Sequence, residues 1–586
     1  MSVLGVNQSV SGLKWVFKES NERLSLALSQ KFGLSEVVAT ALSARGIDLE
    51  TAESYLRPTL KNHLPNPFSL KDMERAARRM ATAIMAGEPI GLMGDYDVDG
   101  ATSTAFLKMF LIECGIKPLC FIPDREDGYG PNIGKMKEFA KAGCKLVATL
   151  DCGMTAFDPL EYGTRICGLD IIVLDHHDPE KTLPNAYAVV NPKRLDEPLD
   201  HPCRYMAAVG VVFLFVVALN NILRSLGFYK DKTEPNLMRY LDLVAFGTVC
   251  DVVKLSGVNR LFVKSGLNQM RLGQNKGIAA LAQLVGLEEA PSAYHLGYVF
   301  GPRINACGRV GKSDIGMRLL STDDEIEAAA LAQILEDLNM TRRDIEAAVL
   351  HAATEQVEHR MADDPFIVVQ GEDWHQGVVG IVAGRLKDKY NLPVFALSIE
   401  GDEVKGSSRS VQGVDLGTLV MNAIEKKILS RGGGHPMAAG FSLHREKLAD
   451  FYNYLKENIT YEQIGTDNQI LEIDGLVDIG GVTPNLTDQI SLLAPFGEAN
   501  PEPRFIVKNV MISRPILLKN GHIACTLSGR GGKYLSGIAF RAEGTPLGDM
   551  LLNTKNKYFH VAGYLKQEHW KGKTKMQIQI HDIASV

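Results

Sequence analysis

The stretch Glu88-Pro-Ile-Gly-Leu-Met-Gly-Asp-Tyr-Asp-Val-Asp-Gly100 decides the fold. Its apolar run, Ile90 to Met93, predicts a buried strand that ends at Gly94, and residues 101–110 have the pattern of a helix. Between the two lie three carboxylates, at Asp95, Asp97 and Asp99. Because carboxylates this close together repel one another, the pattern favours a cation bound beside them.

Two other interpretations of this stretch are open. The spacing D-x-D-x-D-G is how an EF-hand calcium loop begins, but such a loop needs a glutamate at its twelfth position. Counted from Asp95, that position is Phe106, so an EF-hand is disfavoured. An acidic surface turn is the second alternative. The place of the carboxylates after a strand favours a site, because open α/β sheets bind ligands at the carboxyl ends of their strands.

Strand and helix patterns alternate from residue 88 to about 191 and predict a doubly wound parallel sheet in an α/β fold. Further strands are expected at 118–122, 145–150 and 170–174. Asp151 follows one of them directly, and Asp175-His176-His177 follows another. Three strands thus carry acidic or imidazole side chains at their carboxyl ends, which indicates one shared site. A fourth carboxylate, Asp251, ends the run Gly-Thr-Val-Cys-Asp.

Composition limits the class of protein. A chain of 586 residues, with 45% hydrophobic and 23% charged residues, is expected to form three or four globular domains. We see no signal-peptide pattern, and the apolar run Met206–Leu219 is shorter than the about 20 residues of a membrane span, so it predicts a buried helix. Nine cysteines without a C-x-x-C pair argue against disulfides and thiolate zinc, and favour the cytoplasm.

Charge is distributed unevenly along the chain. The net charge is −6, yet residues 505–586 hold 12 Lys and Arg against 4 Asp and Glu, a balance of +8 that leaves −14 for the rest. About five strands are expected in this last segment, which predicts a small OB-fold β-barrel that stacks bases and follows phosphates. A basic barrel used for protein contacts is the alternative. The candidate nucleic-acid-binding residues are Tyr558, Tyr564, Trp570, Lys571 and Lys573.

The middle of the chain predicts a long helix and a second α/β domain. The helix covers residues 324–361, with apolar positions that include Ile326, Ile334 and Ile345. Two motifs follow, Gly406-Ser-Ser-Arg-Ser410 and Gly432-Gly-Gly-His-Pro-Met-Ala-Ala-Gly440. Glycines that expose backbone amides beside Arg and His suit phosphate binding, although tight turns beside a solvated arginine would have the same pattern.

Carboxylates dominate the candidate site, and one imidazole joins them. Such a set suits Mn²⁺ or Mg²⁺ better than zinc, which prefers thiolates. Two ions that share a carboxylate would give the two-metal arrangement of phosphoryl chemistry. The residues expected to form this catalytic set are Asp97, Asp99, Asp151, His176 and Asp251.

The ordered motifs resemble those of the DHH phosphoesterases, and among these they are similar to single-stranded-DNA exonucleases. The resemblance extends from about Pro67 to the end of the chain. The motifs that carry it are Gly94–Gly100, Asp151-Cys-Gly153, Asp175-His-His177, Gly247–Asp251, Gly406–Ser410, Gly433-Gly-His435 with Ala438-Ala-Gly440, and Pro495–Pro501.

The resemblance implies roles for individual residues. One metal would be held by Asp97 and Asp151, with Asp95 where other family members use a histidine that is Met93 here. The second would be held by Asp99, Asp151, His176 and Asp251, so that Asp151 bridges the two ions, and the catalytic His177 would lie near the scissile phosphate. Substrate phosphates would contact Arg125, Arg303, Ser407, Arg409 and His435.

The resemblance also implies the activity and the domain order. We expect 5′→3′ degradation of single-stranded DNA in repair and recombination, with a single-stranded-DNA-binding protein and repair helicases as partners. A phosphodiesterase for short oligonucleotides or cyclic dinucleotides is an alternative, and an inactive DNA-binding scaffold is another. The expected parts are a helical lead-in (1–70), a DHH domain (71–323), a connecting helix (324–361), a DHHA1 domain (362–461), a linker (462–504) and the OB-fold (505–586).

Overall fold

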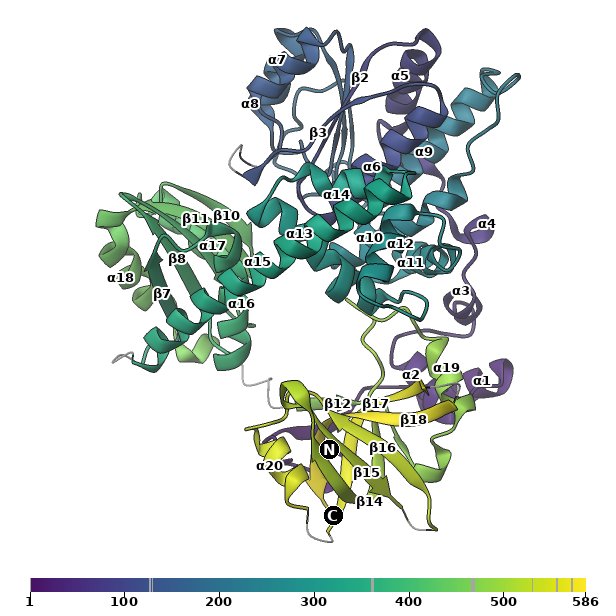
Figure 1. Cartoon of the computed structure of the whole chain (residues 1–586), viewed down its shortest axis with the longest axis vertical. Coiled ribbons are helices and arrows are strands. Elements are labelled where there is room, and N and C mark those ends of the chain that lie inside the picture. The colour runs from purple at the N-terminus through teal and green to yellow at the C-terminus, as the bar shows by residue number, and fades with distance from the viewer. Residues whose placement is uncertain are drawn as a thin grey trace. The chain divides into compact units, whose positions relative to one another are not determined.

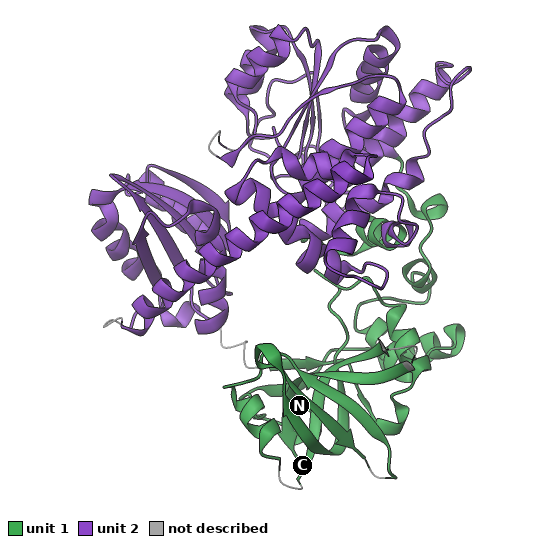
Figure 2. Ribbon diagram, in the orientation of Figure 1, with its two compact units in different colours: residues 1–66, 252–265, 467–586 green, residues 67–251, 266–466 purple. Residues whose placement is uncertain are grey.

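The computed structural model describes residues 2–125, 128, 130–359, 363–464, 470–529, 531–554, 557–570 and 573–586; the side chains of His569, Trp570 and Lys573 are outside this description. The chain forms two compact units (Figure 2). The larger unit contains residues 67–251 and 266–466, and the barrel unit contains residues 1–66, 252–265 and 467–586.

The first sheet of the larger unit has the strand order β3-β2-β4-β5-β6, and all its pairings are parallel (Figure 1). This confirms the predicted parallel sheet. Gly94 is paired with Leu150, and Leu150 with Leu174, so three strands end level with one another. The strands are β2 (Ile90–Gly94), β3 (Leu119–Phe121), β4 (Leu146–Leu150), β5 (Asp170–Leu174) and β6 (Ala188–Val190).

Helices pack around this sheet, and a second group of helices, which follows it in the chain, forms a helical region. Those that connect or cover the strands are α5 (Met73–Ala86), α6 (Val98–Glu113), α7 (Ile133–Lys141), α8 (Phe157–Arg165) and α9 (Ala208–Ser225). Those of the helical region are α10 (Leu241–Cys250), α12 (Lys276–Leu284), the π-helix η5 (His295–Phe300), α13 (Gly301–Val310) and α14 (Asp314–Ser321). Helix α11 (Gly257–Met270) is divided between the two units, because residues 257–265 belong to the barrel unit.

Helix α9 is the one helix in the described part of the chain that is long and apolar enough to cross a membrane. Its apolar window is 78% buried inside the protein, where α9 packs against α5 and α6. The interior of a folded domain therefore accounts for its hydrophobicity, and the predicted buried helix is confirmed. The nine cysteines are all free, as the sequence predicts.

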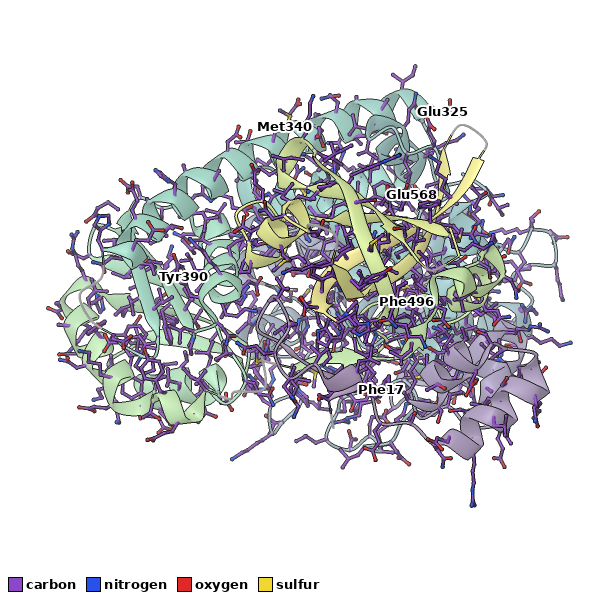
Figure 3. The ribbon with its side chains drawn as sticks, turned by 90° about the horizontal axis from the view of Figure 1, so that it is seen from below. Phe17, Glu325, Met340, Tyr390, Phe496 and Glu568 are labelled. Carbon is purple, nitrogen blue, oxygen red and sulfur yellow. The ribbon has the colours of Figure 1, made fainter. Side chains whose placement is uncertain are left out.

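Helix α15 (Glu325–Glu358) is continuous over 34 residues, and Figure 3 marks Glu325 at its start and Met340 near its middle. Its buried residues include Ala328, Leu331 and Leu335, whereas Ile326 is 83% exposed. The sequence predicted the helix correctly, but Ile326 and Ile334 are not on its buried face because α12, α13 and α14 pack against the neighbouring stripe of alanine and leucine.

A second, mixed sheet follows α15 in the order β10-β11-β9-β8-β7. The first glycine-rich motif lies at the end of β9, and the second spans β10, a two-residue turn at Pro436-Met437 and the start of β11. Gly406 of β9 is required because a Cβ would lie 2.3 Å from the Phe441 ring. The elements are β7 (Ile367–Glu372), α16 (Gln376–Tyr390), β8 (Val394–Glu400), β9 (Glu403–Arg409), α17 (Leu416–Glu425), β10 (Arg431–His435), β11 (Ala438–His444) and α18 (Leu448–Asn458).

The barrel unit contains a sheet of order β13-β14-β15-β16-β18-β17, and an additional β14–β17 pairing closes it into the predicted barrel. Its C-terminal elements are β12 (Ile470–Ile473), β13 (Gly475–Val477), α19 (Pro484–Ser491), β14 (Phe505–Leu517), β15 (Ile523–Ser528), β16 (Tyr534–Ala539), α20 (Pro546–Leu552), β17 (Tyr558–Trp570) and β18 (Lys573–Ser585).

The N-terminal segment belongs to the same unit as the barrel. Strand β1 pairs in parallel with β12, and the buried Trp15 donates a hydrogen bond from Nε1 to the Asp582 carboxylate at 2.8 Å. The expected lead-in therefore contributes a strand as well as helices to the packing of the barrel. Its elements are β1 (Lys14–Phe17), α1 (Glu22–Phe32), α2 (Glu36–Ser43), α3 (Ala52–Leu56) and α4 (Leu60–His63).

Candidate metal centre

The loop between β2 and α6 places the first three carboxylates. Asp97 caps α6 by accepting a hydrogen bond from the Gly100 N–H at 3.0 Å. The loop folds back so tightly that a Cβ at Gly100 would lie 2.4 Å from the Asp95 carbonyl oxygen. Glycine at this position therefore lets the chain turn directly from strand to helix, with Asp99 in the first helical turn.

Asp99 is buried and is held by a second helix. Its carboxylate accepts hydrogen bonds from the backbone N–H groups of Ala208 at 2.6 Å and Val209 at 2.9 Å, at the start of α9. The N-terminus of a helix favours negative charge because its first N–H groups lack partners within the helix. The apolar helix α9 thus contributes directly to the position of an acidic side chain.

The turns after β4 and β5 supply the next residues. Asp151 has a left-handed backbone, with φ of 60°, and its side chain is buried. The carboxylate of Asp175 accepts hydrogen bonds from the backbone of His176 and His177, from Met154 N–H, and from Nδ1 of His177 at 2.7 Å. Asp175 therefore positions the two histidines, a role that sequence reasoning did not assign to it.

His176 lies at the centre of the carboxylates. Its Nε2 is 3.3 Å from an oxygen of Asp151, 3.5 Å from Asp251 and 3.9 Å from Asp99. Asp251 reaches the cluster because it caps the end of α10. Three groups have ligand atoms within 4.8 Å of one another: Asp95 with Asp97 and Asp151, Asp99 with His176 and Asp251, and Asp151 with His176 and His177.

The carboxylates of the site repel one another electrostatically. Burial and neighbouring carboxylates raise the pKa of Asp95, Asp151 and Asp251 well above the usual range, and that of Asp99 to about 7. Burial lowers the pKa of His176 to about 3, so the imidazole is neutral near pH 7. Buried Asp95 Oδ1, Asp251 Oδ2 and both ring nitrogens of His176 have no hydrogen-bond partner among the described residues.

These atoms fit divalent cations. A neutral imidazole and carboxylate oxygens are the ligands that Mn²⁺ and Mg²⁺ accept, and a cation would remove the repulsion that raises the pKa of the acids. The structure brings together every residue that sequence reasoning placed at the metals: Asp95, Asp97, Asp99, Asp151, His176 and Asp251.

A second group of charges, the arginine cluster, consists of Arg125, Arg309 and Arg409. Burial and the nearby charges of the other two, together with Arg342, lower the pKa of Arg309 to about 10. Arg125 donates to the Gly308 carbonyl at 3.1 Å, and Arg309 to the Gly377 carbonyl at 2.7 Å. Arg125 follows β3, Arg309 lies in α13 and Arg409 ends β9, and three half-buried guanidinium groups so close together suit a polyanion.

Arg309 was missed in the sequence, where Arg303 of the same motif was chosen. Arg303 forms an ion pair with Glu336 at 2.5 Å and donates to the Val299 carbonyl, so its charge is already matched. Ser407 lies beside the cluster. A Cβ at Gly380 of α16 would contact both the Ser407 hydroxyl and the Arg409 guanidinium, which shows that these two groups are neighbours. His435 is exposed on β10. No pattern in the sequence separates the two arginines of α13.

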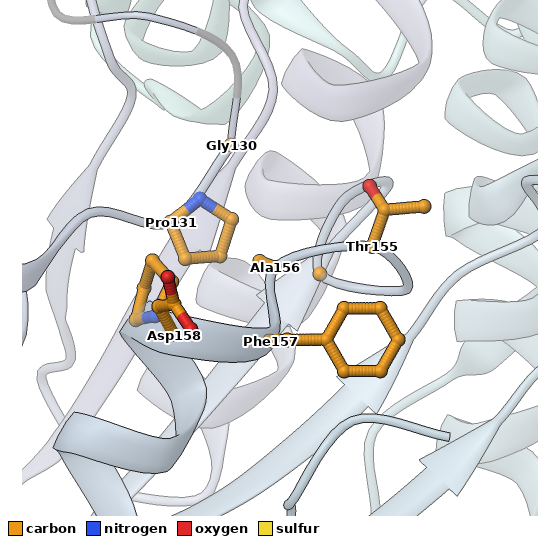
Figure 4. Close-up of a pocket in the computed structure, with 8 residues that line it drawn as sticks. Gly130, Pro131, Thr155, Ala156, Phe157 and Asp158 are labelled. Atoms are coloured by element: carbon orange, nitrogen blue, oxygen red, sulfur yellow. The ribbon is translucent and has the colours of Figure 1, made fainter. Parts of the chain in front are cut away.

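A cavity of about 370 Å³ adjoins the turn that carries Asp151 (Figure 4). Gly153 and Thr155 line it from that turn, together with Pro131 and the first turn of α8, where Phe157 and Asp158 lie. None of the candidate metal ligands lines this cavity.

The expected nucleic-acid-binding residues of the barrel are only partly described. Tyr558 is 41% exposed, whereas Tyr564 is half-buried, with its ring 4.2 Å from the His581 ring and 5.5 Å from the Arg504 guanidinium. Lys571 and the side chains of Trp570 and Lys573 lie outside the described residues.

Tyr558, one of the expected residues, belongs to a row of directly paired residues on the described barrel, the tyrosine row, whose alignment across strands could not be predicted from the sequence. Tyr534 is paired with Ser528, Ser528 with Met511, and Met511 with Tyr558. Side chains of directly paired residues share a face. The neighbours of this row in sequence, such as Leu535 and Phe559, are buried, so the row lies on the outer face, with Lys533 and Lys557 beside it.

Comparison with known proteins agrees with this architecture. Family models match the DHH family N-terminal domain at residues 89–248, the DHHA1 domain at 363–460 and the RecJ OB domain at 473–582. The single-stranded-DNA-specific exonuclease RecJ of Bacillus subtilis is 31% identical over 98% of this chain and 71% of its own length. That of Escherichia coli is 34% identical over 83% of this chain and 86% of its own.

Solved structures show the same fold. The crystal structure of RecJ from Thermus thermophilus in complex with Mn²⁺ has a TM-score of 0.78 and 29% identity, and covers 97% of this chain and 79% of that one. Its complex with Mg²⁺ has a TM-score of 0.74 and 28% identity over 97% and 78%. From the relatives' identity and coverage, together with the three matched domains, it follows that the chain belongs to the RecJ family.

Proposed function

We propose that this protein is a metal-dependent exonuclease that hydrolyses single-stranded DNA from its 5′ end in the cytoplasm, during repair and recombination. The observation that carries the proposal is the pair of ligand sets that meet at Asp151 and His176. Membership of the RecJ family supports the substrate, because its relatives are named single-stranded-DNA-specific exonucleases.

Two divalent cations, Mn²⁺ or Mg²⁺, fit the two ligand sets. Asp95, Asp97 and Asp151 would hold one, and Asp99, His176 and Asp251 would hold the other, with Asp151 shared. When bound, such a pair activates a water molecule and stabilises the leaving oxygen of a phosphodiester. The T. thermophilus relative was crystallised with each of these metals, which supports the assignment.

His177 is proposed to act beside the metals. Its Nδ1–H donates to the buried Asp175, which fixes the ring and leaves Nε2 as the nitrogen that can exchange a proton. The negative charge of Asp175 raises the pKa of His177. With 44% of its side chain exposed, His177 can meet a substrate phosphate and protonate a leaving oxygen.

The arginine cluster is proposed to bind the 5′-terminal phosphate. A terminal phosphate carries more charge than an internal one, and guanidinium groups match its oxygens with paired donors. Arg125, Arg309, Arg409 and the Ser407 hydroxyl would form this pocket, and His435 would contact the strand further along. A pocket that requires a strand end explains why the enzyme would act as an exonuclease.

The tyrosine row is proposed to hold the single strand on the barrel unit. Base stacking on exposed aromatic rings beside lysines tolerates any sequence. An extended strand-binding surface favours long single strands over cyclic dinucleotides, whose binding needs no such row. A single-stranded-DNA-binding protein and repair helicases are proposed as protein partners.

The test is cleavage of single-stranded DNA with a fluorescent label at either end, by the full chain with Mn²⁺ or Mg²⁺. A 3′-labelled strand should shorten progressively while 5′ mononucleotides are released, and chelation by EDTA should stop the reaction. A duplex of the same sequence should resist. Release of label first from the 3′ end, or cleavage of a dinucleotide alone, would refute the proposal.

A further inference from the structure

We infer that the larger unit contains a binding site for a compact organic cation, formed by Asp242 and the apolar residues of α12. The site is a cavity of about 380 Å³ among α10, α12 and the loops on either side of α12. This volume lies in the range of small-molecule sites, about 300–1,000 Å³. The inference is independent of the proposed exonuclease activity.

The cavity has a carboxylate at its buried end. Among the ten described residues that line it, Asp242 alone is charged, and this residue is only 2% exposed. Its carboxylate accepts a hydrogen bond from the backbone N–H of Leu243 at 2.7 Å, and no described Lys, Arg or His forms an ion pair with it within 4.0 Å, although the charge of Arg239 acts on it from further away. A carboxylate buried in this way is stable when a cation or a proton accompanies it.

The walls of the cavity are apolar. Ile278 and Met270 are buried, and Ala282 and Leu287 line the same space. A hydrated metal ion gains nothing from such walls, whereas an ammonium or amidinium group on a hydrocarbon body would fill them and supply positive charge to Asp242. The apolar walls therefore select an organic cation over an inorganic one.

Two side-chain amides also line the cavity, those of Asn275 and Gln283, and both are compatible with such a ligand. The Asn275 side chain has one hydrogen bond at each end, since its oxygen accepts from the Ile278 N–H and its nitrogen donates to the Leu320 carbonyl. Gln283 also lines the cavity and is exposed, so its amide can contact a polar group of the ligand. Burial raises the pKa of Asp242 to about 7, so its surroundings favour a proton or a cation beside the carboxylate.

Helix α10 connects the proposed site to the metal centre. Asp242 lies in the first turn of α10, and Asp251 caps the other end of this ten-residue helix. A small molecule bound at Asp242 would therefore contact α10, the helix that positions Asp251 at the metal centre.

The test is calorimetric titration of the full chain with benzamidine, a planar cation, and with benzamide, a neutral molecule of the same shape. We expect one saturable benzamidine site and binding of benzamide that is weaker by at least about tenfold, because only the cation forms a charge-assisted hydrogen bond. Asp242→Asn should remove the preference. Ala282→Phe should block binding by filling the cavity, and it keeps the test valid if Asp242→Asn fails to fold.

Two controls separate this site from others. Asp323→Asn removes a carboxylate that lines only a smaller neighbouring cavity, which shares Asp242 and Asn275 with the first, and it should leave binding unchanged. Asp151→Asn alters the metal centre and should also leave it unchanged. Equal binding of benzamide, persistence of binding in Ala282→Phe, or loss of binding in Asp151→Asn would overturn the inference.

Discussion

Gly247 of α10 lies against Asp99 of α6 so closely that a Cβ at Gly247 would be 2.9 Å from Oδ1 of Asp99 and 2.4 Å from the Thr102 hydroxyl. This close approach brings the end of α10, and with it Asp251, to the carboxylates that follow β2. The absence of one side chain thus sets the spacing of the metal centre.

Gly247→Ala should therefore impair catalysis. The methyl group must displace either α10 or the Asp99 carboxylate, and we expect kcat/KM for single-stranded DNA to fall at least about tenfold, equivalent to about 1.4 kcal/mol. A higher Mn²⁺ concentration should restore part of the activity. Gly384→Ala on α16 is the matched control, because a Cβ there meets nothing within 4 Å. Equal activity of the two variants would show that the spacing is unimportant.

Asp151→Asn should abolish cleavage and yet stabilise the metal-free protein. Burial and four neighbouring carboxylates disfavour the charge on Asp151, so its removal relieves repulsion when no cation is present. We expect a higher Tm than wild type in EDTA, and a smaller rise in Tm on addition of Mn²⁺. Asp158→Asn, at an exposed carboxylate of α8, controls for the loss of one charge. More than a few per cent of wild-type activity would contradict the bridging role.

The sequence predicted the carboxylate cluster because its geometry is local and periodic. Each of β2, β4 and β5 is a short apolar run, and in a parallel sheet the residues that follow such runs leave at one edge. The register of Gly94, Leu150 and Leu174 produces this arrangement, so Asp95, Asp151 and Asp175 could be placed together from strand ends alone.

The remaining features depend on contacts that sequence spacing does not encode. The proximity of Arg309 to Arg409 requires α13 to pack against α16, and 100 residues separate the two side chains. Trp15 meets Asp582 from the opposite end of the chain. The pattern of Gly406–Ser410 was compatible with a tight turn, but Gly406 lies in β9, where glycine is needed because the Phe441 ring occupies the space of a side chain.

Arg409→Ala should remove the preference for a 5′ phosphate. The proposed pocket matches a terminal phosphate with guanidinium forks, so we expect KM to rise sharply for 5′-phosphorylated strands and little for 5′-hydroxyl strands. Arg409→Lys should recover only part of the preference, because an ammonium lacks the paired donors. Arg431→Ala, at an exposed arginine of β10 in the same sheet, serves as the control. An unchanged preference in Arg409→Ala would place the 5′ phosphate elsewhere.

Replacing Tyr534 and Tyr558 by alanine should weaken binding of long single strands. Each base stacked on an aromatic ring contributes about 1–3 kcal/mol, so the double variant should lose at least about tenfold in affinity. Replacing Lys533 and Lys557 should instead lower the slope of log K against log salt, by about 0.7 for each phosphate contact removed. Lys519→Ala, at the far end of β15, should leave both quantities unchanged. Unaltered affinity in the tyrosine variant would exclude the row from the binding surface.

Asp242→Asn should change how the free energy of unfolding depends on pH. Burial raises the pKa of Asp242 to about 7 in the folded protein, against 3.8 for an ordinary aspartate, so between these values the folded state binds more protons than the unfolded chain. Stability from this group is therefore present below about pH 4 and is lost as the pH rises to 7.

The asparagine of the variant does not titrate, and its side-chain oxygen can still accept the hydrogen bond from Leu243. The free energy of unfolding of the variant should therefore rise relative to that of wild type as the pH increases from 4 to 7, by at most on the order of 4 kcal/mol. Above pH 7 the difference between the two proteins should stay constant. Urea unfolding of both proteins at pH 5 and pH 8 measures this difference, while acids that titrate in both cancel. An equal difference in the free energy of unfolding at pH 5 and at pH 8 would show that the pKa of Asp242 does not fall on unfolding.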